Sequence, residues 1–264
     1  MKSKEYKDYL KKKQKEKIII MITQLLLLIF LILIWQIAAN KELINTFITS
    51  SPKNVLNTII NLYQHNNLWP HIWITSAETL ISFLLGTILG IIIAIILWYN
   101  SFIAKVIDPY LTILNSLPKV SLGPILIIWI GANINSIVIM ALLISLIVTI
   151  ITIYNGFNTT DKAKIKLLNS LNASKIQMLK YLILPANYKT IISSLKINIS
   201  MSLIGVIMGE LLVSKSGIGY LIMYGSQVFN LDLVISGIFI LMIVSYIMYL
   251  LVTYLEKKLI KNET

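Results

Sequence analysis

Long apolar runs separated by polar segments dominate the chain. Five of these runs, each of 18 residues or more, together hold a single charged residue: 18–39, 79–104, 120–160, 197–214 and 233–255. A helix needs about 20 mainly apolar residues to cross a bilayer. The pattern therefore predicts an all-α, polytopic integral membrane protein with six transmembrane helices, at 18–39, 75–98, 108–130, 136–156, 190–213 and 233–255.

The third of these spans is irregular. Asp108, Pro109, Pro118, Lys119 and Pro124 interrupt its apolar run. A broken helix at membrane depth is tolerated only where it packs inside protein or lines a wet cavity. We therefore expect Pro118, Lys119 and Pro124 beside a translocation path, where they shape the break.

Glu210 is the one charged residue in the five apolar runs, near the outer end of the fifth span. A carboxylate inside a bilayer is costly, so its presence needs a reason. Either Glu210 lies at the translocation path or outer gate, or it caps the loop before Gly217 or sits at the membrane interface. Glu78 opens the second span from the outside, and we expect it at the membrane interface rather than buried.

Composition and charge agree with a membrane protein. Hydrophobic residues make up 57% of the chain and charged residues 13%, and the mean hydropathy is +0.81. The net charge is +12, and all 23 basic residues are lysine. These lysines flank apolar spans, and arginine, the usual reader of phosphate and guanine, is absent, which argues against nucleic-acid binding. The absence of cysteine excludes disulfides and thiolate metal sites.

The lysines also predict the orientation in the membrane. The inner segments, with Lys196 at the inner end of its span, hold nineteen lysines, and the outer loops hold three. By the positive-inside rule both termini are cytoplasmic. The 22-residue first run exceeds the about 7–15 residues of a cleavable signal, so it is an uncleaved span. We divide the chain into a lysine-rich cytoplasmic tail (1–17), a six-helix transmembrane domain (18–256) and a second cytoplasmic tail (257–264).

Polar outer segments carry one further helix. Ser51 before Pro52 is a helix-start signal, and apolar residues follow at helical spacing up to Tyr63. This pattern predicts a short amphipathic helix on the outer membrane surface. His65 and His71 lack metal-ligand spacing and are expected at the surface.

The longest polar segment, 158–189, predicts a helical elbow on the cytoplasmic side. Its first helix, 161–171, ends before Asn172, because asparagine readily takes the left-handed conformation that stops helices. Ser174 and Gln177 then form a capping box that starts the second helix, and Pro185 is expected to end it. The first helix places three leucines on one face: Leu167, Leu168 and Leu171.

The elbow resembles the cytoplasmic loop of permease subunits of type I ATP-binding-cassette (ABC) importers. That loop follows Glu-Ala-Ala, three residues, Gly, nine residues and Ile-x-Leu-Pro. Here 166–168, Asn172 and 182–185 take the corresponding positions, although Lys166 replaces the acid and Asn172 replaces the glycine. The sequence Leu-Asn-Ala-Ser at 171–174 is similar to the Leu-Gly-Ala-Ser of the sulfonate, taurine, nitrate and thiamine-precursor branch. Weaker similarities continue in order from about Pro52 to Lys258.

This resemblance implies a type I ABC importer permease fold in the cell membrane of a bacterium. It implies three kinds of partner: two cytoplasmic ABC ATPase subunits, an extracytoplasmic substrate-binding protein and a second, identical permease subunit. The solute would be a sulfonate, a nitrate-like anion or a pyrimidine or thiamine precursor, with no cofactor or metal. In such permeases the elbow couples to the ATPase, which here would involve Leu167, Leu168, Leu171, Asn172, Ala173, Ser174 and Pro185. ATP hydrolysis itself is expected in a separate subunit, because no Gly-x-x-x-x-Gly-Lys-Ser/Thr motif occurs.

Two other classes remain as alternatives. A secondary or ion-driven transporter would show inverted repeats and charge pairs inside the membrane, and Glu210 is the single intramembrane charge that stands out. A membrane-embedded enzyme would need clustered His, Asp or Glu residues within the spans, and the sequence shows no such cluster.

Overall fold

The computed structural model describes residues 4–261, which form helices joined by short loops. The long helices are α1 (Lys4–Asn40), α4 (Leu68–Tyr99), α7 (Ile134–Asn158), α11 (Tyr188–Val213) and α13 (Leu231–Lys261). The shorter ones are α2 (Thr46–Thr49), α3 (Pro52–Gln64), α5 (Ser101–Ser116), α6 (Gly123–Ile130), α8 (Lys162–Ser170), α9 (Lys175–Met178), α10 (Leu184–Ala186) and α12 (Ile218–Gln227).

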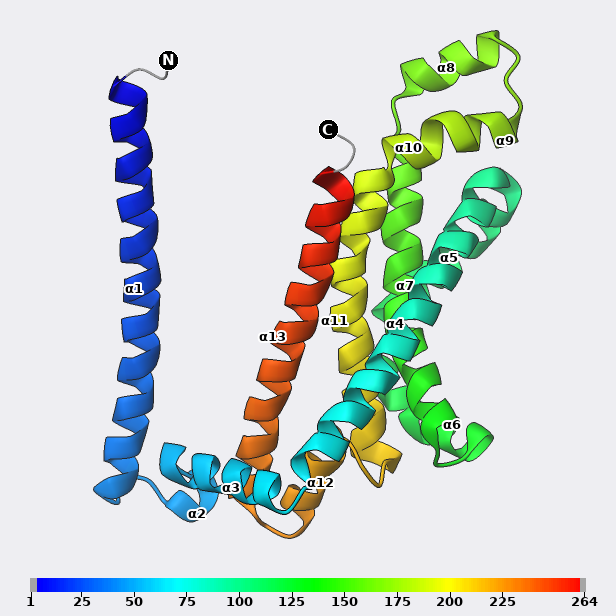
Figure 1. Ribbon diagram of the computed structural model, residues 1–264. Helices are drawn as coiled ribbons and strands as arrows, with labels where there is room; N and C mark the ends of the chain where they lie inside the picture. Colours follow the sequence, from blue (N-terminus) through cyan, green and yellow to red (C-terminus); the bar gives the residue numbers. More distant parts are fainter. Residues whose placement is uncertain (1–3, 262–264) are drawn as a thin grey trace.

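Six membrane crossings account for the arrangement of these helices. Among residues 4–261, the five long helices are each long and apolar enough to span a membrane. Helix α5 and the segment 119–130 form the sixth crossing, although the two parts meet at 92°. Both ends of the described chain and helices α8–α10 lie at the upper end in Figure 1, while α2, α3 and α12 lie at the lower end. The predicted all-α membrane fold with six spans is confirmed.

The third span begins earlier than the sequence predicted. It starts at Ser101 rather than near 108, because the Asn100 side chain accepts hydrogen bonds from the backbone N–H groups of Phe102 (3.0 Å) and Ile103 (3.2 Å). Asparagine at this position satisfies N–H groups that the first helical turn leaves unpaired. The break itself falls at 117–118, beside Pro118, whereas Pro109 lies within α5 and Pro124 lies in the first turn of α6.

Helices α4, α7 and α11 meet in the centre of the bundle through small and polar residues. Gly205 of α11 faces α7 so closely that a Cβ atom there would lie 3.0 Å from the Cβ of Ala141. Asn198 of α11 is buried and donates a hydrogen bond from Nδ2 to Oγ1 of Thr87 on α4 at 2.6 Å. Within a bilayer, close backbone approach and interhelical hydrogen bonds of this kind hold helices together.

Helix α1 contacts the rest of the molecule at its lower end. Trp35 stacks on Phe239 of α13 with ring centroids 6.3 Å apart, and the Gln36 side chain accepts a hydrogen bond from the backbone N–H of Lys53 at 3.0 Å. None of the 18-residue window that qualifies α1 as a span is buried in the molecule. Figure 1 shows α1 standing apart from the other long helices, so its apolar surface is open to lipid or protein neighbours.

Helix α3 starts where the Ser-Pro signal predicted it. The Ser51 hydroxyl accepts a hydrogen bond from the backbone N–H of Asn54 at 3.2 Å, and Pro52 occupies the first turn. Its apolar residues form two stripes rather than one. Val55, Ile59 and Leu62 pack on the bundle, while the second stripe is exposed: Leu56, Ile60 and Tyr63.

Candidate functional site

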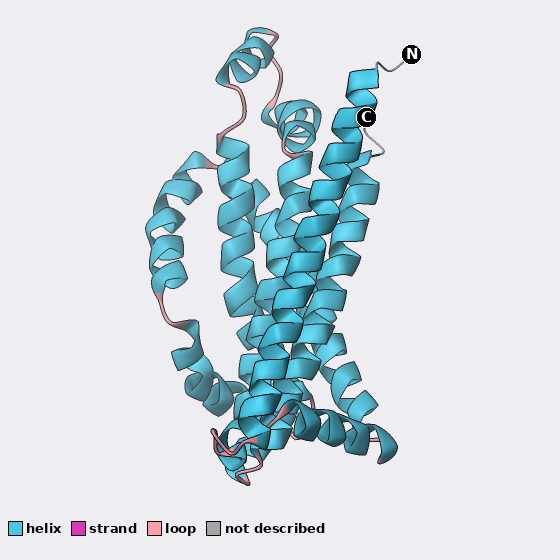
Figure 2. Ribbon diagram, turned by 90° about the vertical axis from the view of Figure 1, so that its left-hand side faces the viewer, coloured by secondary structure: helices cyan, strands magenta, loops and turns pink. Residues whose placement is uncertain are grey.

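The elbow (158–189) projects from the upper end of the bundle between α7 and α11 (Figure 1). Its first leg, α8, begins at Lys162, because the Asp161 side chain accepts a hydrogen bond from the backbone N–H of Ala163 at 2.8 Å. Figure 2 shows the two legs as separate helices joined by a loop. The sequence predicted this arrangement.

The first leg ends in a Schellman motif at Asn172. This residue has φ of 56°, in the left-handed region. Its backbone N–H donates to the carbonyl oxygen of Asn169 at 3.0 Å, and that of Ala173 donates to the carbonyl oxygen of Leu168 at 3.0 Å. These two bonds satisfy carbonyl groups that the last helical turn leaves unpaired. The predicted role of Asn172 as a helix stop is confirmed.

The second leg begins with the predicted capping box. The Ser174 hydroxyl accepts a hydrogen bond from the backbone N–H of Gln177 at 3.3 Å, and the Gln177 side chain accepts one from the backbone N–H of Ser174 at 2.7 Å. The loop between the legs is therefore fixed from both sides by local hydrogen bonds.

Pro185 does not end the second leg, and that prediction is wrong. The helix widens into a π-helical turn over Leu179–Ile183 and continues through Pro185 to Ala186. Proline has no N–H and crowds the preceding turn. In the wider turn the backbone N–H of Leu184 donates to the carbonyl oxygen of Leu179, five residues earlier. This wider spacing accommodates the proline and lets the helix continue.

A buried asparagine clamps the base of the elbow. Asn187, 6% exposed, donates from Nδ2 to Oγ1 of Thr160 at 2.7 Å and to the carbonyl oxygen of Ile183 at 2.9 Å. Thr160 lies where the chain enters the elbow, and Asn187 lies where it leaves. The two ends are therefore held together, which favours movement of the elbow as one unit.

The three leucines of the first leg, two in α8 and one directly after it, do not share one exposed face. Leu168 packs inward with Ile165 on the core cluster around Phe157, whereas Leu167 and Leu171 point away from the core. The predicted single ridge is therefore wrong for Leu168. Four large apolar side chains of the elbow are 60–68% exposed: Leu167, Leu171, Ile176 and Tyr181.

Ile176 and Tyr181 were missed by the sequence reasoning. Their signal was present, because each is a large apolar residue beside lysine in a segment that lies outside the spans. Exposed apolar side chains that cluster on one small element mark a contact surface for another protein.

The bend between α5 and α6 brings together the residues predicted beside the path. Pro118 and Pro124 are exposed, and Lys119 is half-buried. The Lys119 ammonium donates a hydrogen bond to the carbonyl oxygen of Asn115 at 2.9 Å, in the last turn of α5. A cation at this position is favourable because the carboxyl end of a helix carries partial negative charge. Lys119 therefore stabilises the bend.

Glu210 lies in a buried network at the lower end of the bundle, far along the helices from the elbow. It is 1% exposed, and its carboxylate accepts hydrogen bonds from the Thr75 hydroxyl and from the backbone N–H of Gly219, each at 2.6 Å. Gly219 belongs to the first turn of α12, whose N–H groups have no helical partner. This geometry favours the capping role of Glu210 over a place on the path.

Helix α4 supplies the rest of this network. The backbone N–H of Gly217 donates to Nδ1 of His71 at 2.9 Å, and that of Ile218 donates to the Thr75 hydroxyl at 2.8 Å. The His71 ring stacks on Tyr220 with centroids 5.9 Å apart. His71 is half-buried, so the expectation of a surface histidine is wrong.

Glu78 is likewise buried rather than interfacial, with 4% exposure. A regular stripe on α4 could have revealed this. Polar residues recur there at intervals of three or four, which places them on one helical face directed at α7, α11 and α12. They are His71, Thr75, Glu78, Thr79 and Ser82.

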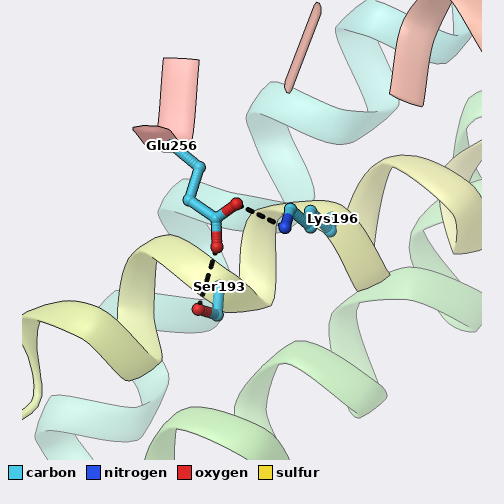
Figure 3. A network of polar contacts seen from close by, with 3 residues as sticks. All are labelled: Ser193, Lys196 and Glu256. Carbon is cyan, nitrogen blue, oxygen red and sulfur yellow. Dashed lines mark hydrogen bonds and ion pairs between the residues drawn. The ribbon is translucent and has the colours of Figure 1, made fainter. Parts of the chain in front are cut away.

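An ion pair joins α11 to α13 at the upper end. The Lys196 ammonium pairs with the Glu256 carboxylate, whose other oxygen accepts a hydrogen bond from the Ser193 hydroxyl at 3.1 Å (Figure 3). Charged groups that are partly withdrawn from water gain from such pairing. Nothing in the amino-acid sequence indicated that Lys196 and Glu256, 60 positions apart, would meet.

Comparisons with known proteins agree with this geometry. The family described as the binding-protein-dependent transport system inner membrane component matches residues 86–261. The chain is 30% identical over 237 residues to a Haemophilus influenzae protein named "Probable ABC transporter permease protein", covering 89% of this chain and 96% of the relative. It is 21% identical to the taurine transport system permease protein of Escherichia coli, and the match covers 87% of this chain and 85% of that relative.

Another relative is the formylaminopyrimidine transport permease protein of Halalkalibacterium halodurans. It is 25% identical, and the match covers 89% of this chain and 93% of that relative. Among solved structures, an inward-facing MetNI methionine ABC transporter matches with a TM-score of 0.64 at 15% identity, covering 75% of this chain and 96% of that chain. This last likeness shows the fold. Together with the six spans and the elbow, these matches establish that the chain belongs to the binding-protein-dependent transport family and is the membrane-spanning permease of an ABC importer.

Proposed function

We propose that this permease passes a small polar solute from an extracytoplasmic binding protein across a bacterial cell membrane. The solute classes are sulfonates, nitrate-like anions and pyrimidine or thiamine precursors. Support comes from relatives named for taurine and for formylaminopyrimidine, which align with this chain over most of their length. Two cytoplasmic ABC ATPase subunits would supply the energy, so this chain itself would carry no hydrolytic site.

The main structural support for this proposal is the shape and the exposed apolar surface of the elbow. Its first leg is stopped at Asn172, its second is started at Ser174, and its base is closed by Asn187, so its shape is set before any partner arrives. Four large apolar side chains stand exposed on this preorganised element. Their burial in a groove of the ATPase would stabilise the complex by about 25 cal/mol for each Å2 removed from water.

Leu171→Glu tests the docking of the ATPase. We expect this change to weaken association about 30-fold, since a buried leucine contributes about 2 kcal/mol and a carboxylate would lose its hydration without a partner. Association is measured by co-purification of the ATPase and by titration in detergent. Solute-stimulated ATP turnover in liposomes should fall in parallel.

Asn169→Glu is the matched control, because it adds the same charge to the opposite side of α8. It should leave association within about twofold of the unchanged protein. Full association of the Leu171→Glu variant would show that the elbow is not the docking element.

We further propose that two copies of the chain form the complete pathway. The observation that supports pairing is the exposed surface of α6, where Ile128 and Trp129 are 81% and 78% exposed. Aromatic and large aliphatic residues of this kind are enriched in protein interfaces. The path would then run between the copies, beside the bend that holds Pro118, Lys119 and Pro124.

The orientation is tested with reporter fusions. We expect fusions after Asn67 and Ser226 to report the outside and fusions after Thr160 and Lys261 the inside. The first reason is the lysine asymmetry, which places the lysine-rich segments inside. The second is that both ends of the described chain lie at the same end of the bundle as the elbow. A cytoplasmic signal from the fusion after Asn67 would contradict this layout.

A further inference from the structure

The second leg of the elbow touches the end of α4. The Lys175 ammonium donates a hydrogen bond to the carbonyl oxygen of Tyr99 at 3.2 Å and lies 5.6 Å from the centre of the Tyr99 ring. Lys175 is the first residue of α9, and Tyr99 is the last residue of α4. Figure 1 shows α9 above the turn that joins α4 to α5.

The position of this contact follows from the chemistry of helix ends. The last carbonyl groups of α4 have no helical N–H partner and carry partial negative charge. An ammonium group is a suitable partner for such a carbonyl, and the face of an aromatic ring attracts the same cation. Lys175 makes both contacts with one residue, and the capping box at Ser174 fixes where its side chain starts.

Apolar packing supports the same connection. Met178 of α9 is buried in a core cluster with Ala94 of α4, and Trp98 packs against this cluster. Leu168 of α8 joins it from the other leg. The second leg is therefore tied to the end of α4, and the same cluster includes residues of the first leg and of α7.

The end of α4 is also the beginning of α5. Asn100 alone separates the two helices, and its side chain caps α5 through the backbone N–H groups of Phe102 and Ile103. Helix α5 then leads to the bend at 117–118 and to α6. A displacement of the α4–α5 turn would thus be carried directly into the broken span.

We propose that Lys175 is a positioning residue that ties the elbow to the α4–α5 turn, so that movement of the elbow by the ATPase is passed to α5 and the bend. The idea rests on the proposed docking of the ATPase at the elbow. It assigns Lys175 to transmission within the permease and not to the ATPase contact itself.

The test separates transmission from docking. Lys175→Met keeps most of the aliphatic stem but loses the charge and the donor, and Lys175→Arg keeps both. Each permease is reconstituted in liposomes with its ATPase and binding protein. Association, ATP hydrolysis and solute uptake are measured on the same preparation, with Lys189→Met as a control that removes an exposed lysine from the other end of the elbow.

For Lys175→Met we expect association within about twofold of the unchanged protein, but about fivefold more ATP hydrolysed for each solute taken up, a typical size for coupling between sites. Lys175→Arg should restore the ratio, and Lys189→Met should not change it. A ratio for Lys175→Met equal to that of Lys189→Met would overturn the proposal.

Loss of the ATPase from Lys175→Met would also overturn it, because Lys175 would then belong to the docking surface. Failure of the docking proposal looks different, since it shows as full association of the Leu171→Glu variant. A distance measurement gives an independent check. Spin labels at Phe102 and Ile176, both exposed, should show a broader distance distribution in Lys175→Met than in Lys175→Arg.

Discussion

Gly205→Leu is expected to remove most of the folded permease from the membrane. At this position α11 approaches α7 so closely that even a Cβ atom would lie 3.0 Å from the Cβ and 3.1 Å from the backbone nitrogen of Ala141. Leucine adds three further carbon atoms to that space. Overpacking of a core commonly costs about 1–3 kcal/mol, and here the obstacle includes backbone, which does not move aside as a flexible side chain does.

The amount of monodisperse protein after detergent extraction and its thermal unfolding midpoint measure this effect. Ile204→Leu is the matched control, because it places leucine at a neighbouring, 46% exposed position on the same helix. It should leave both values close to those of the unchanged protein. Normal yield and midpoint for Gly205→Leu would mean that α7 and α11 are not in close contact here.

Glu210→Ala is expected to be nearly as damaging. Removal of the carboxylate leaves the Thr75 hydroxyl and the backbone N–H of Gly219 without their acceptor in the buried network. Each buried donor left without a partner costs about 1–3 kcal/mol. The start of α12 would loosen, and the unfolding midpoint and yield would fall.

This experiment also decides between the two roles of Glu210. A capping residue lowers stability when it is removed, whereas a path residue changes the kinetics of uptake and leaves the folded amount intact. Glu16→Ala, at an exposed carboxylate on α1, serves as the control. Unchanged stability together with altered uptake would return Glu210 to the path.

The sequence predicted best what is decided by neighbours along the chain. The left-handed Asn172 and the capping box at Ser174 depend on groups within five residues, and both were predicted at the correct positions. The five unbroken spans follow from apolar length alone. Pro185 was misjudged because a π-helical turn accommodates a proline that a regular α-helix would not.

Contacts between residues far apart in the chain could not be predicted from the sequence. Glu210 was visible as a lone charge, but its partner Thr75 lies 135 positions away and its second partner is a backbone N–H. Likewise, the α-helical period put Leu167 and Leu168 side by side without showing which of them the core would cover. That choice depends on how the elbow rests on α4 and α7, which no local pattern encodes.

The local closure of the elbow has a consequence for biogenesis. Its helix stop and capping box join residues three to five positions apart, and contacts of this range form within microseconds. Ribosomes add about 5–20 residues each second, so the local hydrogen bonds within the segment 161–178 have time to form before the next transmembrane helix has been synthesised. Each nascent permease therefore has the local hydrogen bonds of its elbow in place while α11 and α13, two of its six spans, are still to be synthesised.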